Sequence, residues 1–167
     1  MVSFVEMASV SNDGYIENKE DRLLGDVRKG GYTYFAEGDI IIAKITPCME
    51  NGKCAVARDL TNGIGFGSSE FHVFRCHEDI VRTDYLFGYL NRQVIRTNAE
   101  RAMTGASGHR RVPISFYEEL RIPILPLDEQ DRIVAEARKL QNEIIRAEEK
   151  ISGLEEKKKA IIDSYLS

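Results

Sequence analysis

A heptad pattern near the C-terminus constrains the fold of this chain more than any other feature of its sequence. From residue 133 onward, apolar or aromatic side chains recur at alternating steps of four and three residues, with one lysine among them. This spacing aligns them along one narrow stripe of an α-helix, as in the seam of a coiled coil. The predicted seam consists of Ile133, Ala137, Leu140, Ile144, Ala147, Ile151, Leu154, Lys158, Ile161 and Tyr165.

The composition separates this helix from the rest of the chain. All 4 prolines and 12 of the 13 glycines lie within residues 1–126. We therefore predict a globular domain at 1–126 and a long helix at 127–167. Asp128 is predicted to cap the first turn of this helix, and Glu129 and Asp131 place negative charge at the positive end of the helix dipole. The charged flanks of the stripe favour pairing with another helix over packing along the globular domain.

The composition also excludes several classes of protein. An apolar fraction of 43% and a net charge of only -4 argue against a disordered chain. No apolar run reaches the roughly 20 residues of a membrane helix, and no secretory signal is visible at the N-terminus. Three cysteines at irregular spacing favour a reducing, cytoplasmic location. Because the net charge is negative, any DNA contact requires a local basic patch.

Four segments of the globular part show strand patterns. The continuous apolar run of Ile40–Ile45 predicts a buried strand, and Lys53–Arg58 predicts a strand that returns beside it. Glu70–Arg75 alternates with the period of a strand. Leu120–Leu125 predicts a last strand at a sheet edge, because Pro123 cannot donate to a ladder.

One helix is predicted within the globular part, from Asp84 to Met103, with Thr83 as its cap and Gly105 closing it. Its predicted buried face consists of Leu86, Leu90 and Val94. Strands and helix together predict an α/β (α+β) domain with a twisted, mostly antiparallel sheet, followed by the long helix.

No catalytic or metal-binding constellation emerges from the sequence. The cysteines and histidines between residues 48 and 77 form no Cys-x-x-Cys or His-x3–5-His pair, which zinc sites usually require. The Gly-x-Ser-x-Gly motif of serine hydrolases is absent. The run Gly63–Ser69 precedes a strand pattern, whereas a phosphate-binding loop precedes a helix. We therefore interpret it as a tight turn, and we predict no catalytic residue and no metal site.

A local basic patch lies between residues 91 and 111, a segment that contains five arginines and only one acidic residue, a glutamate. It ends in Thr104–Arg111, a small, flexible and polar segment that becomes basic at its close. Arginine can make bidentate contacts with phosphate and guanine, which lysine cannot. The alternative interpretation is a solvated turn whose charges serve solubility.

Four segments together resemble the DNA-specificity subunit of type I restriction–modification systems. They are Gly38–Lys53, Asn62–Val73, Thr104–Val112 and Ile122–Gln130, in the order expected for that family. The resemblance implies an α/β target recognition domain that reads one half of a split DNA sequence. It also implies that the long helix pairs antiparallel with a second such helix and acts as a spacer.

The same resemblance implies a subunit without catalytic activity and without a cofactor. An adenine methyltransferase subunit would use S-adenosylmethionine, and a separate restriction/translocase subunit would use ATP. The chain holds one recognition domain and one helix, about half of the usual subunit, so it is either a fragment or a natural half-subunit. For a half-subunit, the unpaired seam predicts a homodimer.

Local charge and resemblance indicate the same two loops as the DNA-binding site. Short polar side chains after the Ile40–Ile45 strand suit contact with base edges, although this loop has the alternative interpretation of a simple hairpin. Two arginines on the predicted helix suit contact with phosphates. The predicted DNA-binding residues are Thr46, Asn51, Lys53, Arg92, Arg96, Ser107, His109, Arg110 and Arg111.

Two other classes of function remain as alternatives. The first is a coiled-coil assembly module without DNA readout, which a salt-dependent DNA-binding assay with the methyltransferase subunit would distinguish. The second is a nuclease or methyltransferase, but the motifs of both are missing from the sequence. The DNA target itself depends on groove contacts and DNA deformation, which one sequence does not reveal.

Overall fold

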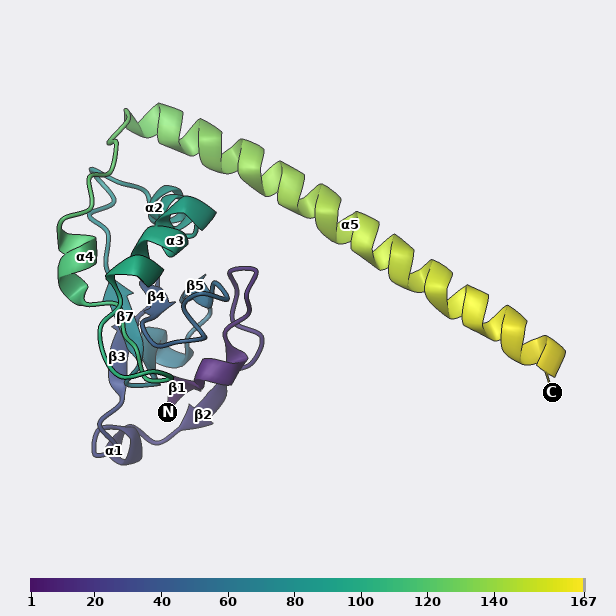
Figure 1. The fold of residues 1–167 in the computed structure, drawn as a ribbon, viewed down its shortest axis with the longest axis horizontal. Coiled ribbons are helices and arrows are strands. Elements are labelled where there is room, and N and C mark those ends of the chain that lie inside the picture. The colour runs from purple at the N-terminus through teal and green to yellow at the C-terminus, as the bar shows by residue number, and fades with distance from the viewer. Residues whose placement is uncertain (167) are drawn as a thin grey trace. The chain divides into compact units, whose positions relative to one another are not determined.

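The computed structural model describes residues 1–166. The chain divides into two compact units, Met1–Leu127 and Asp128–Ser167 (Figure 1). The first unit contains two β-sheets, short helices and the 3-10 turns Met7–Ser9 and Thr61–Gly63. Within residues 1–166, no helix combines the length and the apolar character that a membrane span requires.

The larger sheet has four strands in the order β2-β1-β6-β3. They are β2 (Glu20–Arg22), β1 (Val2–Val5), β6 (Ile64–Gly67) and β3 (Thr33–Ala36). The central pair β1 and β6 runs parallel, and both outer pairings are antiparallel. Helix α1 (Leu24–Val27) places its buried valine in an apolar cluster with side chains of β1 and β6.

Strand β6 corrects the interpretation of Gly63–Ser69 as a tight turn. Its residues Ile64–Gly67 form the central strand between β1 and β3, because the glycines of this strand provide space. A Cβ atom on Gly65 would lie 2.1 Å from the ring of Phe35, and one on Gly67 would lie 2.5 Å from the Val5 carbonyl oxygen. Glycine inside a strand therefore marks a close approach here.

The smaller sheet has the order β5-β4-β7, with both pairings antiparallel. Its strands are β5 (Cys54–Val56), β4 (Ile40–Ala43) and β7 (Phe71–Phe74). The predicted buried strand and its returning partner are confirmed, with shorter bounds. Among the described residues, four of the five strand pairings are antiparallel, so the predicted fold class is confirmed. The strands form two sheets, however.

Strand β4 is apolar throughout because it is buried on both faces. Ile41 belongs to a core that joins both sheets, whereas Ile40 and Ile42 pack with Leu86 and Leu90 of α2. The core that joins the sheets contains Val5, Val10, Phe35, Ile41, Ala55, Ala57, Leu60 and Phe71. At about 25 cal/mol per Å² of apolar surface, burial of these side chains is the main contribution to the stability of the domain.

The predicted helix from Asp84 to Met103 is two helices, α2 (Thr83–Leu90) and α3 (Gln93–Ala102). Arg92 adopts an extended backbone conformation (φ -63°, ψ 139°), which interrupts the helix. Leu86 and Leu90 are buried as predicted. The interruption changes the face that α3 buries, so Val94 is 49% exposed and Ile95 is buried in its place.

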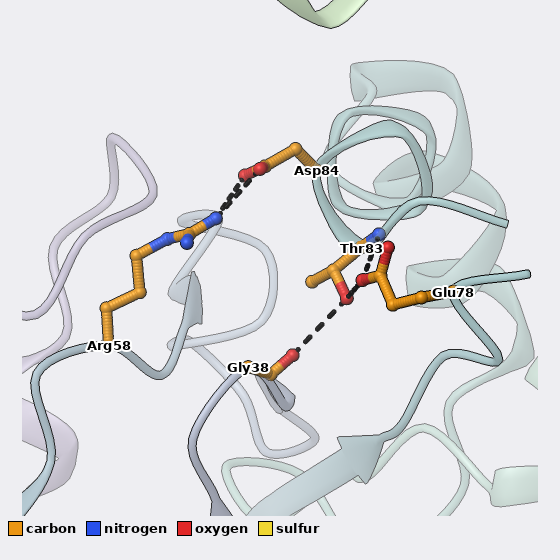
Figure 2. Close-up of polar contacts among 5 residues, drawn as sticks. All are labelled: Gly38, Arg58, Glu78, Thr83 and Asp84. Atoms are coloured by element: carbon orange, nitrogen blue, oxygen red, sulfur yellow. Dashed lines mark hydrogen bonds and ion pairs between the residues drawn. The ribbon is translucent and has the colours of Figure 1, made fainter. Parts of the chain in front are cut away.

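Thr83 does not cap α2 as predicted, because it is the first helical residue. The carboxylate of Glu78 takes the capping role and accepts hydrogen bonds from the Thr83 amide (3.0 Å) and hydroxyl (2.6 Å). Figure 2 shows this contact beside the ion pair between Asp84 and Arg58, which is 2.7 Å long. Two carboxylates therefore lie at the start of α2, where the helix dipole favours negative charge.

The predicted strand at Leu120–Leu125 is wrong: the segment forms no ladder. It follows helix α4 (Ile114–Glu118) and is fixed instead by tyrosines of α2. The Tyr85 hydroxyl donates to the Pro123 carbonyl oxygen at 2.9 Å, and the Tyr89 hydroxyl donates to the Arg121 carbonyl oxygen at 3.1 Å. Side chains thus satisfy the carbonyl groups that a sheet would otherwise satisfy.

Helix α5 spans Leu127–Leu166, 40 residues, which corresponds to about 60 Å. Because it begins at Leu127, Asp128 lies inside the first turn beside Glu129 and does not cap the helix as predicted. The side chains at all ten predicted seam positions are exposed, including Leu140 (59%) and Leu154 (55%). The apolar stripe is therefore exposed along the described part of this helix.

Candidate nucleic-acid interface

The two loops predicted from the sequence lie side by side. The first loop (residues 46–53) follows β4, and the second loop (residues 104–111) follows α3. The Thr46 amide donates to the Arg110 carbonyl oxygen at 3.0 Å, and the Val112 amide donates to the Lys44 carbonyl oxygen at 2.8 Å. An isolated antiparallel bridge joins Ile45 to Arg111. Segments more than 60 positions apart thus form one surface.

A separate apolar cluster holds these loops on α3. It consists of Met49, Ala99, Met103 and Val112, with Phe116 and Tyr117 packed against it. The first loop contributes Met49, α3 contributes Ala99, and the segment after the second loop contributes Val112. Because each segment buries a side chain here, the cluster fixes the relative position of the two loops.

Within the first loop, the three predicted residues are in different environments. The Thr46 hydroxyl donates to the Glu50 carboxylate at 2.5 Å, and the Thr46–Pro47 peptide bond is cis. The Lys53 ammonium donates to the Val10 carbonyl oxygen at 2.6 Å and so ties the loop to the N-terminal segment. Asn51 is exposed. Of the three, Asn51 is therefore the side chain that the loop leaves available to a ligand.

The second loop exposes its small polar side chains. Ser107 and His109 are exposed, and Gly105 adopts a positive φ of 115°. A Cβ atom on Gly105 would lie 2.9 Å from the His109 carbonyl oxygen, so the turn requires glycine. Arg110 donates from Nη2 to the Glu100 carbonyl oxygen at 2.8 Å, which orients its guanidinium along the end of α3.

Arg111 forms an ion pair that the sequence did not reveal. Its guanidinium donates to both carboxylate oxygens of Glu70, at 2.9 and 2.7 Å. This contact is the main reason that the pKa of the Glu70 carboxyl lies below its ordinary value. Next to it, His72 hydrogen-bonds to the Val112 carbonyl oxygen at 2.8 Å, and burial lowers the pKa of its imidazole. His72 is therefore a structural residue of β7.

The two predicted arginines of the helical region, Arg92 and Arg96, lie in different environments. Arg92 is exposed, with its guanidinium carbon 5.4 Å from the centre of the Tyr89 ring. Arg96 is half-buried, lies against Gly52 of the first loop and donates to Gln93 at 2.7 Å. The structure thus brings eight of the nine predicted residues to the paired loops or into contact with them. Their binding to DNA stays a prediction.

Glu70 is the residue of this surface that sequence reasoning missed. It precedes β7, far from Arg111 in sequence, and an isolated glutamate carries no local signal of its partner. Across residues 1–166, no three or more histidine, cysteine, aspartate or glutamate side chains are grouped so that they could hold a metal ion.

We expect Glu70→Gln to weaken the fold in a pH-dependent way. Because the carboxyl pKa is lowered in the folded state, the ion pair stabilises the fold above the unfolded-state pKa of roughly 4.3. That contribution is lost as the pH falls through the folded-state value. Urea unfolding of both proteins between neutral pH and pH ~3 should show a difference that shrinks on acidification. Glu118→Gln on α4 is the matched control, and an equal trend in both variants would contradict the assignment.

Two sheets that share an apolar core, a pair of adjoining loops and a long C-terminal helix make up the fold of this chain and its candidate site. The family model for the type I restriction modification DNA specificity domain matches residues 3–156, and the chain belongs to this family. It is 46% identical over 135 residues to the specificity subunit of the type I restriction enzyme EcoAI of Escherichia coli. It is 41% identical over 141 residues to the EcoEI specificity subunit from the same organism.

These alignments cover 80% and 83% of this chain, but only 23% of each relative. The crystal structure of the HsdS subunit from Thermoanaerobacter tengcongensis shares the fold, with a TM-score of 0.71 and 21% identity over 88% of this chain and 37% of that one. A second structure, reported in a study of complex assembly and conformational transition of the type I R-M system, also shares the fold. Its TM-score is 0.69 and its identity 24%, over 88% of this chain and 37% of that one.

Proposed function

We propose that this chain supplies DNA sequence specificity to a type I restriction–modification complex by reading half of a bipartite site. Membership of the specificity family, together with two adjoining loops that expose Asn51, Ser107 and His109, supports this function. The chain itself would be non-catalytic. Its role would be to place a methyltransferase on the correct DNA.

The proposed contacts divide into positioning and reading. Arg92 and Arg110 present guanidinium groups that suit DNA phosphates and set the orientation of the domain. Asn51 presents an amide, which suits the paired donor and acceptor of adenine in the major groove. Ser107 and His109 add hydrogen-bonding groups beside it.

The proposed partners follow from the relatives' description as restriction-enzyme specificity subunits. They are double-stranded DNA, an adenine methyltransferase subunit that binds S-adenosylmethionine, and a restriction/translocase subunit that uses ATP. We also propose that α5 pairs with the α5 helix of a second copy. In a twofold dimer the same stripe would serve on both chains.

The function is tested by DNA binding at several salt concentrations, with the chain alone and with the methyltransferase subunit. A net charge of -4 leads us to expect weak binding alone and sequence-selective binding in the complex. Selection of bound duplexes from a random library would identify the target. A complex that binds every duplex equally, and that loop substitutions leave unchanged, would instead favour an assembly module.

Arg110→Ala should weaken binding of this complex to all duplexes alike. The loss of one phosphate contact reduces the slope of log K against log salt by about 0.9. Titrations at four or more salt concentrations measure this slope. Arg28→Ala removes the same charge at the end of α1, outside both loops, and should leave the slope unchanged. Equal slopes for Arg110→Ala and the unmodified chain would remove Arg110 from the interface.

A further inference from the structure

A small cavity lies between the first loop and the junction of α2 and α3. Gly52 and Lys53 of the loop, Asn91 of the junction and Arg96 of α3 contribute to its lining. Apolar side chains close the remainder, among them Ile42 and Leu90. The cavity offers about 10 Å³ to water, which is close to the size of the site of one molecule.

Two of the residues that line this cavity each have a buried polar atom without a hydrogen-bond partner in the protein. They are the Nε atom of Arg96, which carries a hydrogen, and the Oδ1 atom of Asn91, which accepts one. An unpaired buried polar group destabilises the folded state, because it loses its hydrogen bonds to water without replacement. One water molecule can accept from the first and donate to the second, and this removes both penalties.

Arg96 also fits closely over the backbone of the first loop. A Cβ atom on Gly52 would lie 1.8 Å from Nη1 of Arg96 and 3.0 Å from its Cζ, and Gly52 has a positive φ of 86°. The guanidinium thus occupies the space that any larger residue at position 52 would need. Its Nη2 donates to Gln93, so the group is held in place from its own helix.

We propose that Arg96 positions the first loop through this contact and through a water molecule shared with Asn91, and that it does not bind a DNA phosphate. The proposal rests on the proposed function only where it concerns DNA. The part that concerns the loop conformation can be tested without DNA, on two hydrogen bonds within the loop. The Gly52 amide donates to the Met49 carbonyl oxygen at 2.9 Å, and the Lys53 amide donates to the Cys48 carbonyl oxygen at 3.0 Å.

Amide hydrogen exchange on the full chain tests the structural part. Arg96→Ala should accelerate exchange at Gly52 and Lys53 about tenfold relative to the β4 amides, whereas Arg92→Ala should leave it unchanged. Arg96→Lys should not restore protection, because lysine lacks the Nε–H group and the planar fork. Unchanged exchange in Arg96→Ala would overturn the proposal. So would the absence of a nuclear Overhauser effect between the Arg96 Nε–H proton and a long-lived water.

A double-mutant cycle of Gly52 and Arg96 measures their contact independently of how strongly either single variant destabilises the fold. Gly52→Ala strains the backbone in every background, but it meets the guanidinium only when Arg96 is present. Gly52→Ala should therefore lower the midpoint of thermal unfolding less in Arg96→Ala than in the unmodified chain. Additive shifts would show that the two residues do not act on each other and would overturn the proposal.

Binding of the complex with the methyltransferase subunit to a random-sequence duplex tests the part that concerns DNA. Arg92→Ala should reduce the salt slope, and Arg96→Ala should leave the slope unchanged while relaxing the base preference in library selection. A reduced slope in Arg96→Ala would make Arg96 a phosphate contact and overturn the proposal. Absence of all DNA binding would contradict the proposed function. Amide hydrogen exchange and the double-mutant cycle would still decide whether Arg96 positions the first loop.

Discussion

Leu154→Glu should convert the proposed α5 dimer into a monomer. Leu154 is at a seam position and is 55% exposed in the single chain, so a partner helix would bury it. The substitution removes about 2 kcal/mol of apolar burial from each chain, about 4 kcal/mol for the dimer, and it places two carboxylates in the seam. The dissociation constant should rise roughly a thousandfold. Sedimentation equilibrium at micromolar concentration measures it.

Asn142→Glu is the matched control for this substitution. It adds the same charge to α5, but position 142 lies on the face opposite the seam, between Leu140 and Ile144 in the heptad. The control should remain a dimer. A monomeric unmodified chain, or a dimer that survives Leu154→Glu, would contradict pairing through this stripe.

Phe35→Ala should cost about 3–5 kcal/mol of folding stability. The Phe35 side chain is fully buried in the core that joins both sheets, and its ring occupies the space left by Gly65 and Gly67. Its removal leaves a cavity that rigid strands on either side cannot close. Urea unfolding of the full chain measures the free energy. Tyr34→Ala provides the comparison, because Tyr34 lies next to it on β3 with half of its side chain exposed. Equal losses at both positions would contradict this account of the core.

The elements with a strong local pattern could be predicted from the sequence. The β4 and β5 pair follows from a continuous apolar run and its returning partner, and α5 follows from a period that holds for more than four heptads. The break between α2 and α3 could not be predicted, because no proline or glycine marks Arg92. Burial of Ile95 in place of Val94 depends on contacts with other elements. Likewise, the glycines of β6 suggested a turn because the ring that needs their space lies on another strand.

The candidate site shows the same limit. Composition and resemblance identified both loops, but their adjacency comes from hydrogen bonds such as that between Thr46 and Arg110. No periodicity reports a contact over such a separation. The partners of the charged groups were hidden for the same reason. Arg111 faces Glu70 and Lys53 faces Val10, and each pairing depends on how distant strands and turns pack.

The second loop rests on the apolar cluster of Met49, Ala99, Met103 and Val112, while Ser107 and His109 point away from the core as exposed side chains. Substitution of Ser107 or His109 therefore changes the hydrogen-bonding groups at the surface and leaves the packing of the apolar cluster unchanged. Gly105 must be retained, since its turn admits no larger residue. For the proposed DNA contacts, positions 107 and 109 together with Asn51 are therefore the set to randomise in libraries aimed at new target preferences on an unchanged scaffold.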